Sequence, residues 1–169
     1  MIPPAPVGRT AFLLGFAGLL PQIAAVLILL LGSPLFQLYQ GGLPVIVLVP
    51  LVALTYAGLI LSFLGGTWWG FAVRSADGQG RTVALAVLPS LTAWVVGSGV
   101  TGLSVEVQLL LMGVAIIATL PVDWYLSLQG MAPANWLRLR VPLSLGLGGL
   151  TCLLSTLTVE PIITGLTTR

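Results

Sequence analysis

Long runs of apolar residues, separated by short polar stretches, dominate this chain. Five runs hold almost no charged residue and reach the roughly 20 residues that an α-helix needs to cross a bilayer core of ~30 Å. The pattern therefore predicts an all-α integral membrane bundle of five transmembrane helices, which forms a single transmembrane domain over residues 1–169. The expected helices cover approximately residues 11–31, 44–73, 82–100, 105–126 and 136–157.

Composition supports this prediction, because 57% of the 169 residues are hydrophobic and only 6% are charged. A water-soluble core of that size cannot bury so much apolar surface, and the surplus requires lipid. Arg9 precedes the first run as in a signal peptide, but the run is long and lacks a small-residue cleavage pattern, so we expect it to be retained. Between the first two runs, residues 35–39 are expected to lie at the membrane surface.

The distribution of charge predicts the orientation of the bundle. Five of the six basic residues fall on one predicted side, whereas the other side receives Glu106, Glu160 and only Arg169. The positive-inside rule then places the N-terminus in the cytoplasm and the C-terminus outside. The arginines of the expected cytoplasmic side are Arg9, Arg74, Arg81, Arg138 and Arg140, and lipid headgroups are natural partners for Arg74 and Arg81.

Four of the five tryptophans agree with this orientation, because they fall near the predicted cytoplasmic boundary, where an amphipathic ring is favoured. We expect these residues to be interface anchors: Trp68, Trp69, Trp124 and Trp136. Trp94 lies deep in the expected third helix, where its indole N–H requires a partner. Packing in the core is the favoured role for Trp94, and stacking against a ligand is the alternative.

Small residues recur at every fourth position in two of the expected helices, which lets helix backbones approach closely in a membrane. We expect both rows to mark faces that meet neighbouring helices, either in this chain or in a second protein. The rows are Gly58, Ser62, Gly66 and Gly70 in the second helix, and Ser144, Gly148, Cys152 and Thr156 in the fifth. Four prolines within or near the helices are expected to kink them: Pro50, Pro89, Pro121 and Pro142.

The residues commonly used in catalysis and metal binding are scarce, since the chain has no histidine or lysine and one cysteine, Cys152. We expect no metal, haem or other cofactor and no nucleic-acid site, and an inert thiol at Cys152. The carboxylates Asp77, Glu106, Asp123 and Glu160 are spread over both faces, which makes an enzyme the least favoured class. Glu106 follows Ser104 at a helix start, where a carboxylate and a capping hydroxyl are both favourable.

The most informative polar cluster combines Asp123 with Arg138 and Arg140. A short connection around Gly130 and Pro133 brings the end of the fourth helix beside the start of the fifth, so an ion pair is geometrically easy. The favoured interpretation is a structural clamp at surface level, because an unpaired charge is unfavourable near the membrane. The alternative makes Asp123 a proton-carrying or substrate-binding group.

Three stretches resemble a family of small bacterial inner-membrane proteins of unknown function that also includes mitochondrial transmembrane protein 69. They are Ser-Phe-Leu-Gly-Gly-Thr-Trp-Trp-Gly at 62–70, Leu-Met-Gly-Val at 111–114 and Pro-Ala-Asn-Trp-Leu-Arg-Leu-Arg at 133–140. The resemblance implies a five-helix protein of the bacterial cytoplasmic (inner) membrane and supplies no activity. Relatives often have His or Arg at the position of Trp68, so a polar role is not expected there.

Small size, smooth helix faces and short loops favour a non-enzymatic accessory, assembly or structural protein. Such a protein would pack within lipid against a larger, energy-converting membrane complex or against copies of itself. The competing hypothesis is a small transporter or channel with a cavity near Trp94, Asp123 and Arg138.

Overall fold

The computed structural model describes residues 6–31, 39–40, 43–74 and 79–167, with side chains described for residues 6–31, 47–74 and 79–158. Seven helices dominate this part of the chain: α1 (Arg9–Ala17), α2 (Leu20–Leu31), α3 (Val45–Ala72), α4 (Gln79–Gly97), α5 (Val105–Ala118), α6 (Leu120–Leu128) and α7 (Trp136–Thr167). Two short strands, β1 (Tyr39–Gln40) and β2 (Leu43–Pro44), pair antiparallel before α3.

These helices form five segments that are long and apolar enough to cross a membrane, which confirms the predicted number. The first segment combines α1 with α2, and the fourth combines α5 with α6. The segments are Arg9–Leu31, Val47–Ala72, Gln79–Gly97, Val105–Leu128 and Trp136–Thr158. Many large apolar side chains point outward, including Leu13, Val52 and Leu88, as a surface in contact with lipid requires.

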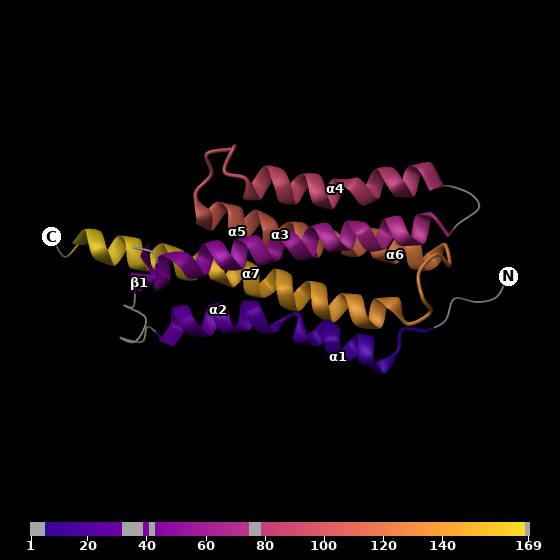
Figure 1. Ribbon diagram of the computed structural model, residues 1–169, viewed down its shortest axis with the longest axis horizontal. Coiled ribbons are helices and arrows are strands. Elements are labelled where there is room, and N and C mark those ends of the chain that lie inside the picture. The colour runs from indigo at the N-terminus through magenta and orange to yellow at the C-terminus, as the bar shows by residue number, and fades with distance from the viewer. Residues whose placement is uncertain (1–5, 32–38, 41–42, 75–78, 168–169) are drawn as a thin grey trace.

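The segments lie roughly side by side, with α3, α5 and α7 between α4 on one side and the α1–α2 pair on the other (Figure 1). The largest core cluster follows this arrangement. It includes Leu61 of α3, Met112 and Ile116 of α5 and Leu154 of α7, all almost completely buried. The chain enters the bundle at one end through α1 and leaves at the opposite end through α7 (Figure 1).

Two of the membrane segments are broken, and only one of the breaks was predicted. The fourth segment breaks at Thr119, immediately before Leu120 and Pro121, because Pro121 has no N–H to continue the hydrogen-bond ladder of α5. The first segment breaks at Gly18, the residue that follows α1, whose backbone N–H donates to the carbonyls of both Leu14 and Gly15. Pro21 lies in the first turn of α2. By contrast, Pro50 and Pro89 lie inside α3 and α4 without ending them.

Two helix ends differ from the sequence-based expectation. The third segment ends at Gly97 rather than Val100, because the following turn places Gly99 and Gly102 at φ +73° and +65°, values that favour glycine. α7 continues to Thr167 rather than ending near Leu157, since apolar residues continue past that point along the chain. Of the expected surface segment at 35–39, all but Tyr39 lies outside the described residues.

Glycines allow α5 and α7 to approach closely. A methyl group added at Gly113 of α5 would lie 2.6 Å from both Sγ of Cys152 and the carbonyl oxygen of Gly148. A methyl group at Gly148 of α7 would lie 2.6 Å from Cγ1 of Ile117. Gly148 and Cys152 of the second small-residue row therefore pack against α5, whereas Thr156 of the same row is exposed.

The small-residue row of α3 divides between two faces. Gly58 lies near Met112 of α5, and the hydroxyl of Ser62 is 2.9 Å from that of Ser90 in α4. Gly66 and Gly70 instead have no other part of the described chain within 4 Å of an added methyl group. The reason is geometric: a four-residue step turns about 40° too far on an α-helix, so the row rotates by roughly 120° over three steps.

A close contact of α3 with α4 is made by Gly65, which the row of every fourth residue does not include. A methyl group at Gly65 would clash with the carbonyl oxygen of Ala86. Close approach of these two helices therefore depends on a glycine beside the predicted row.

We expect Gly113→Ala to lower the thermal stability of the protein in mild detergent, because its methyl group would overlap Cys152 and Gly148. Overpacking of this kind typically costs ~1–3 kcal/mol. Gly66→Ala is the matched control, because its methyl group meets open space and alanine favours the helix by up to ~1 kcal/mol. Equal unfolding temperatures for the two variants would contradict the close packing of α5 on α7.

Candidate functional site

The side chain of Asp123 lies in the interior of the bundle and is 0% exposed. Asp123 is in the first turn of α6, which restarts after the break at Thr119 and Pro121. Its backbone N–H donates to the carbonyl of Thr119, and a carboxylate in this position is favoured by the positive end of the helix dipole. The break between α5 and α6 thus places an acidic group inside the protein.

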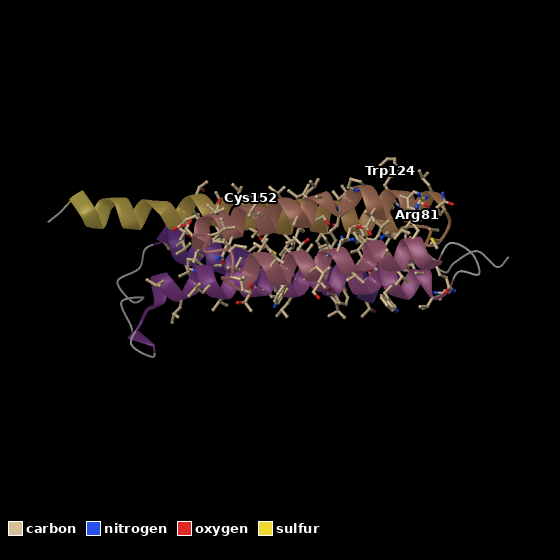
Figure 2. All side chains as sticks on the ribbon, turned by 90° about the horizontal axis from the view of Figure 1, so that it is seen from above. Arg81, Trp124 and Cys152 are labelled. Carbon is tan, nitrogen blue, oxygen red and sulfur yellow. The ribbon has the colours of Figure 1, made fainter. Side chains whose placement is uncertain are left out.

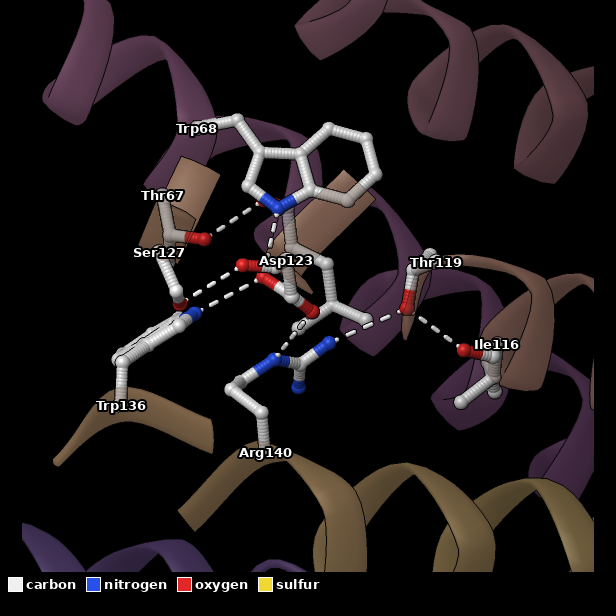
Figure 3. A network of polar contacts seen from close by, with 9 residues as sticks. Thr67, Trp68, Ile116, Thr119, Asp123, Ser127, Trp136 and Arg140 are labelled. Atoms are coloured by element: carbon white, nitrogen blue, oxygen red, sulfur yellow. Dashed lines mark hydrogen bonds and ion pairs between the residues drawn. The ribbon is translucent and has the colours of Figure 1, made fainter. Parts of the chain in front are cut away.

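Three donors surround the carboxylate of Asp123 (Figure 3). The indole N–H groups of Trp68 and Trp136 both donate to Oδ1, each at 2.9 Å. Nε of Arg140 donates to Oδ2 at 2.9 Å, which is also the ion pair. The three donors come from α3 and α7, so one carboxylate joins α6 to two other helices.

The side chain of Arg140 is only 6% exposed and makes further contacts inside the bundle. Its Nη2 donates to the hydroxyl of Thr119 at 3.2 Å, and that hydroxyl donates to the carbonyl of Ile116 at 2.6 Å. The guanidinium lies 5.8 Å from the centre of the Trp136 ring, and Phe71 meets the same ring edge to face. These contacts fix the guanidinium beside the break between α5 and α6.

The geometry supports a structural role for this cluster. A charged side chain at the centre of a transmembrane helix costs ~2.5–3.5 kcal/mol on insertion scales, and a pair with satisfied hydrogen bonds removes much of that cost. Both oxygens of Asp123 are already occupied by donors from the chain. We call Asp123, Trp68, Trp136, Arg140 and Thr119 the Asp123 cluster.

The predicted ion pair of Asp123 is confirmed with Arg140 but not with Arg138. Arg138 is exposed. Two residues separated by two positions on an α-helix point about 200° apart, so Arg138 and Arg140 cannot both face the same carboxylate. Asp123 is completely buried, so the clamp lies inside the bundle. Its level in the membrane stays a prediction.

The tryptophans separate into inward and outward side chains. Trp68 is only 3% exposed and donates to Asp123, so it is not an interface anchor, and it does have a polar role. Its neighbour Trp69 is about 100° away on α3 and is exposed, as is Trp124, which lies toward the same end of the bundle as Arg81 (Figure 2). Trp136 is partly buried. An anchoring role for Trp69 and Trp124 stays a prediction.

Trp94 does not pack in the core, contrary to expectation, because its side chain is 64% exposed. It lies near the end of α4 rather than deep within the helix, since α4 ends at Gly97. An exposed Trp94 and an exposed Arg138 do not face the buried Asp123, so the structure does not bring together the three residues of the expected transport cavity.

A second buried polar group, at Gln22 of α2, was missed in the sequence. Its Nε2 donates to the carbonyl of Ala53 at 3.2 Å and to the hydroxyl of Thr151 at 2.8 Å. Its Oε1 is buried without a hydrogen-bond partner. A glutamine within an apolar run is the signal that identifies such a site, because an amide side chain in lipid requires partners from neighbouring helices.

Two smaller expectations concern the start of α5 and metal binding. Ser104 is the N-cap residue and Glu106 lies in the first turn, as predicted, but the Ser104 side chain makes no capping hydrogen bond. Separately, the side-chain amide of Gln108 donates to the carbonyl of Leu103 at 2.8 Å. Among the described residues, no three His, Cys, Asp or Glu side chains come together in a group able to hold a metal ion.

Comparison with known proteins gives one family match. Residues 7–158 match the family described as Protein of unknown function (DUF3429), a range that contains all of the Asp123 cluster. No curated protein and no solved structure matches the chain.

We expect Asp123→Asn to destabilise the protein by ~3–5 kcal/mol, because the substitution leaves the buried guanidinium of Arg140 without a counter-charge. Arg138→Gln is the control and should change the thermal unfolding temperature in detergent little, since Arg138 is exposed. The double variant Asp123→Asn/Arg140→Gln should be more stable than the sum of the single effects implies. Additive effects would show that the two side chains do not interact.

Proposed function

This chain belongs to the family described as Protein of unknown function (DUF3429), and we propose that it is a non-enzymatic accessory, assembly or structural protein of a larger membrane complex. The proposal places it in the bacterial cytoplasmic (inner) membrane and its partner within the lipid phase. The proposed partner is an energy-converting complex of that membrane.

The observation that carries the proposal is the outward face of α3. Gly66 and Gly70 lie four residues apart on this face, each with open space around it, and exposed Leu59 and Val73 flank them. A glycine in a helix is less favourable than alanine by about 1 kcal/mol. Within the described chain, no close helix contact at Gly66 or Gly70 offsets this cost. We call Leu59, Gly66, Gly70 and Val73 the open α3 face.

The internal contacts of this protein show what such glycines do. At Gly65, Gly113 and Gly148 the missing side chain lets a neighbouring helix approach to backbone contact. In a membrane, close backbone packing is a main source of helix association, because lipid tails are as apolar as the side chains. The open α3 face offers the same device to a transmembrane helix of a partner.

The hydrogen bonding within the Asp123 cluster also supports a structural role. Its carboxylate and guanidinium are engaged with each other and with Trp68, Trp136 and Thr119. Such a cluster holds α3, α6 and α7 in a fixed arrangement and thereby presents the open α3 face as a rigid surface.

A transporter is the second candidate, and one observation favours it: cavities adjoin the Asp123 cluster from two sides. One cavity of about 500 Å³ is lined by Trp136 and Arg140, and another of about 220 Å³ is lined by Trp68 and Thr119. Vesicles containing the purified protein and a pH-sensitive dye discriminate the two candidates. The leading proposal expects no flux, whereas a proton flux that Asp123→Asn abolishes would favour transport.

We expect Gly66→Leu to reduce copurification of a membrane partner at least several-fold while leaving the fold intact. The Cβ of this leucine would meet open space, so its side chain would extend over the open α3 face. Gly149→Leu is the matched control, because Gly149 is also an exposed helix glycine with open space around it. Purification in mild detergent followed by mass spectrometry measures both variants, and equal recovery of the partner would refute a role for this face.

The proposed orientation predicts that the two termini are reached from opposite sides of the membrane, with the N-terminus in the cytoplasm. The arginine-bearing helix ends support it, since Arg9, Arg81 and Arg138 all lie at or near the start of α1, α4 and α7. Fusion of alkaline phosphatase after Arg169 should give an active enzyme. Alkaline phosphatase fused before Met1 should be inactive, because it would lie in the cytoplasm. Activity of both fusions would exclude this topology.

A further inference from the structure

Two buried side-chain atoms have no hydrogen-bond partner in the part of the chain that the structure describes: Oε1 of Gln22 and Oγ of Ser144. Gln22 is 0% exposed and Ser144 is 1% exposed. Along α7, Ser144 lies about 12 Å from Trp136, and Thr151, which binds Gln22, lies about 22 Å from Trp136. Both atoms therefore lie well within the length of the fifth membrane segment, away from bulk water.

The orientation of the Gln22 amide is fixed by its partners. Its Nε2 donates to the carbonyl of Ala53 and to the hydroxyl of Thr151. The Thr151 hydroxyl donates its own hydrogen to the carbonyl of Leu147, so it can only accept from Gln22. Exchanging oxygen and nitrogen in the amide would place acceptor against acceptor at both contacts. Oε1 therefore requires a donor that the described chain does not supply.

Ser144 lies one helical turn after Arg140, on the same face of α7. Side chains at positions i and i+4 of a helix have Cβ atoms roughly 5–6 Å apart. Nε and Nη2 of Arg140 are bound to Asp123 and Thr119, whereas Nη1 makes no hydrogen bond within the described part of the chain (Figure 3). A water molecule with a hydrogen bond of about 2.8 Å on each side spans such a gap. Nη1 of Arg140 and Oγ of Ser144 are therefore within reach of one bridging water.

Space for water adjoins both polar sites. The cavity of about 500 Å³ between α1, α3 and α7 is lined by Arg140 and Leu147, which lie about one turn on either side of Ser144. Gly18, one turn before Gln22, lines the same cavity. One water needs about 30 Å³ and two to four polar partners. Hydrocarbon can neither donate to Oε1 nor accept from Nη1, whereas water can do both.

We propose that two bound waters hydrate the inner face of α7. One donates to Oε1 of Gln22, and the other accepts from Nη1 of Arg140 and donates to Oγ of Ser144. These waters complete the hydrogen bonding of the two side chains that join α7 to α2 and to α6. They are structural ligands of the bundle interior. Their sites are separate from the open α3 face and do not depend on the proposed partner.

Solid-state NMR of the full-length, deuterated and back-exchanged protein in deuterated lipid tests the proposal, because it measures magnetisation transfer from water to side-chain N–H protons. We expect transfer to the Gln22 amide and the Arg140 guanidinium at rates within about threefold of that to the exposed Gln129. The buried indole N–H of Trp68, which is bound to Asp123, is the internal control and should receive magnetisation about tenfold more slowly. Transfer to Gln22 and Arg140 as slow as that to Trp68 would overturn the proposal.

A matched pair of variants locates the bridging water. Ser144→Ala removes one of its partners and should slow transfer to Arg140 about threefold or more while leaving Gln22 unchanged. Thr156→Ala removes an exposed hydroxyl from the same helix and should change neither rate. Ser144→Ala should also lower the thermal unfolding temperature in detergent, because it removes a satisfied hydroxyl. A higher unfolding temperature, or unchanged transfer to Arg140, would show that no water joins Ser144 to Arg140.

Discussion

The ion pair of Asp123 with Arg140 is the interaction on which the arrangement of the helices depends. Neither charge would be tolerated alone at this depth, and the pair is completed by two indole N–H groups and a hydroxyl. The break at Thr119 and Pro121 aims the carboxylate inward, and α7 supplies the guanidinium. Because the donors come from separate helices, the charges are satisfied only when α3, α6 and α7 are assembled.

Backbone contact is the second constraint, and it explains where this protein uses glycine. Gly65, Gly113 and Gly148 are needed inside the bundle, because a single methyl group at any of them would overlap a neighbouring backbone or side chain. Gly66 and Gly70 are not needed inside, since open space surrounds both. A rigid bundle with a smooth outer face on α3 is well suited to stand beside a larger membrane protein, which is the basis of the proposed function.

The α1 helix lies at the edge of the bundle, and none of its residues is buried. It is attached through Asn135 at its start and Tyr56 at its end, and between them Gly15 packs against Leu139 and Leu143 of α7 beside an apolar cavity. Arg140 connects this cavity with the Asp123 cluster, because the same guanidinium lines the cavity and holds the carboxylate.

The sequence by itself determined the class of protein and the number of membrane segments, because the length and apolarity of each run are properties of consecutive residues. It also grouped Asp123 with Arg138 and Arg140, without distinguishing between the two arginines. Only the tertiary structure decided that Trp68 points inward and Trp69 outward, that Arg138 is left outside, and that Gly65 rather than Gly66 meets α4. These outcomes depend on how each helix is rotated against its neighbours, and in uniformly apolar helices no polar face records that rotation.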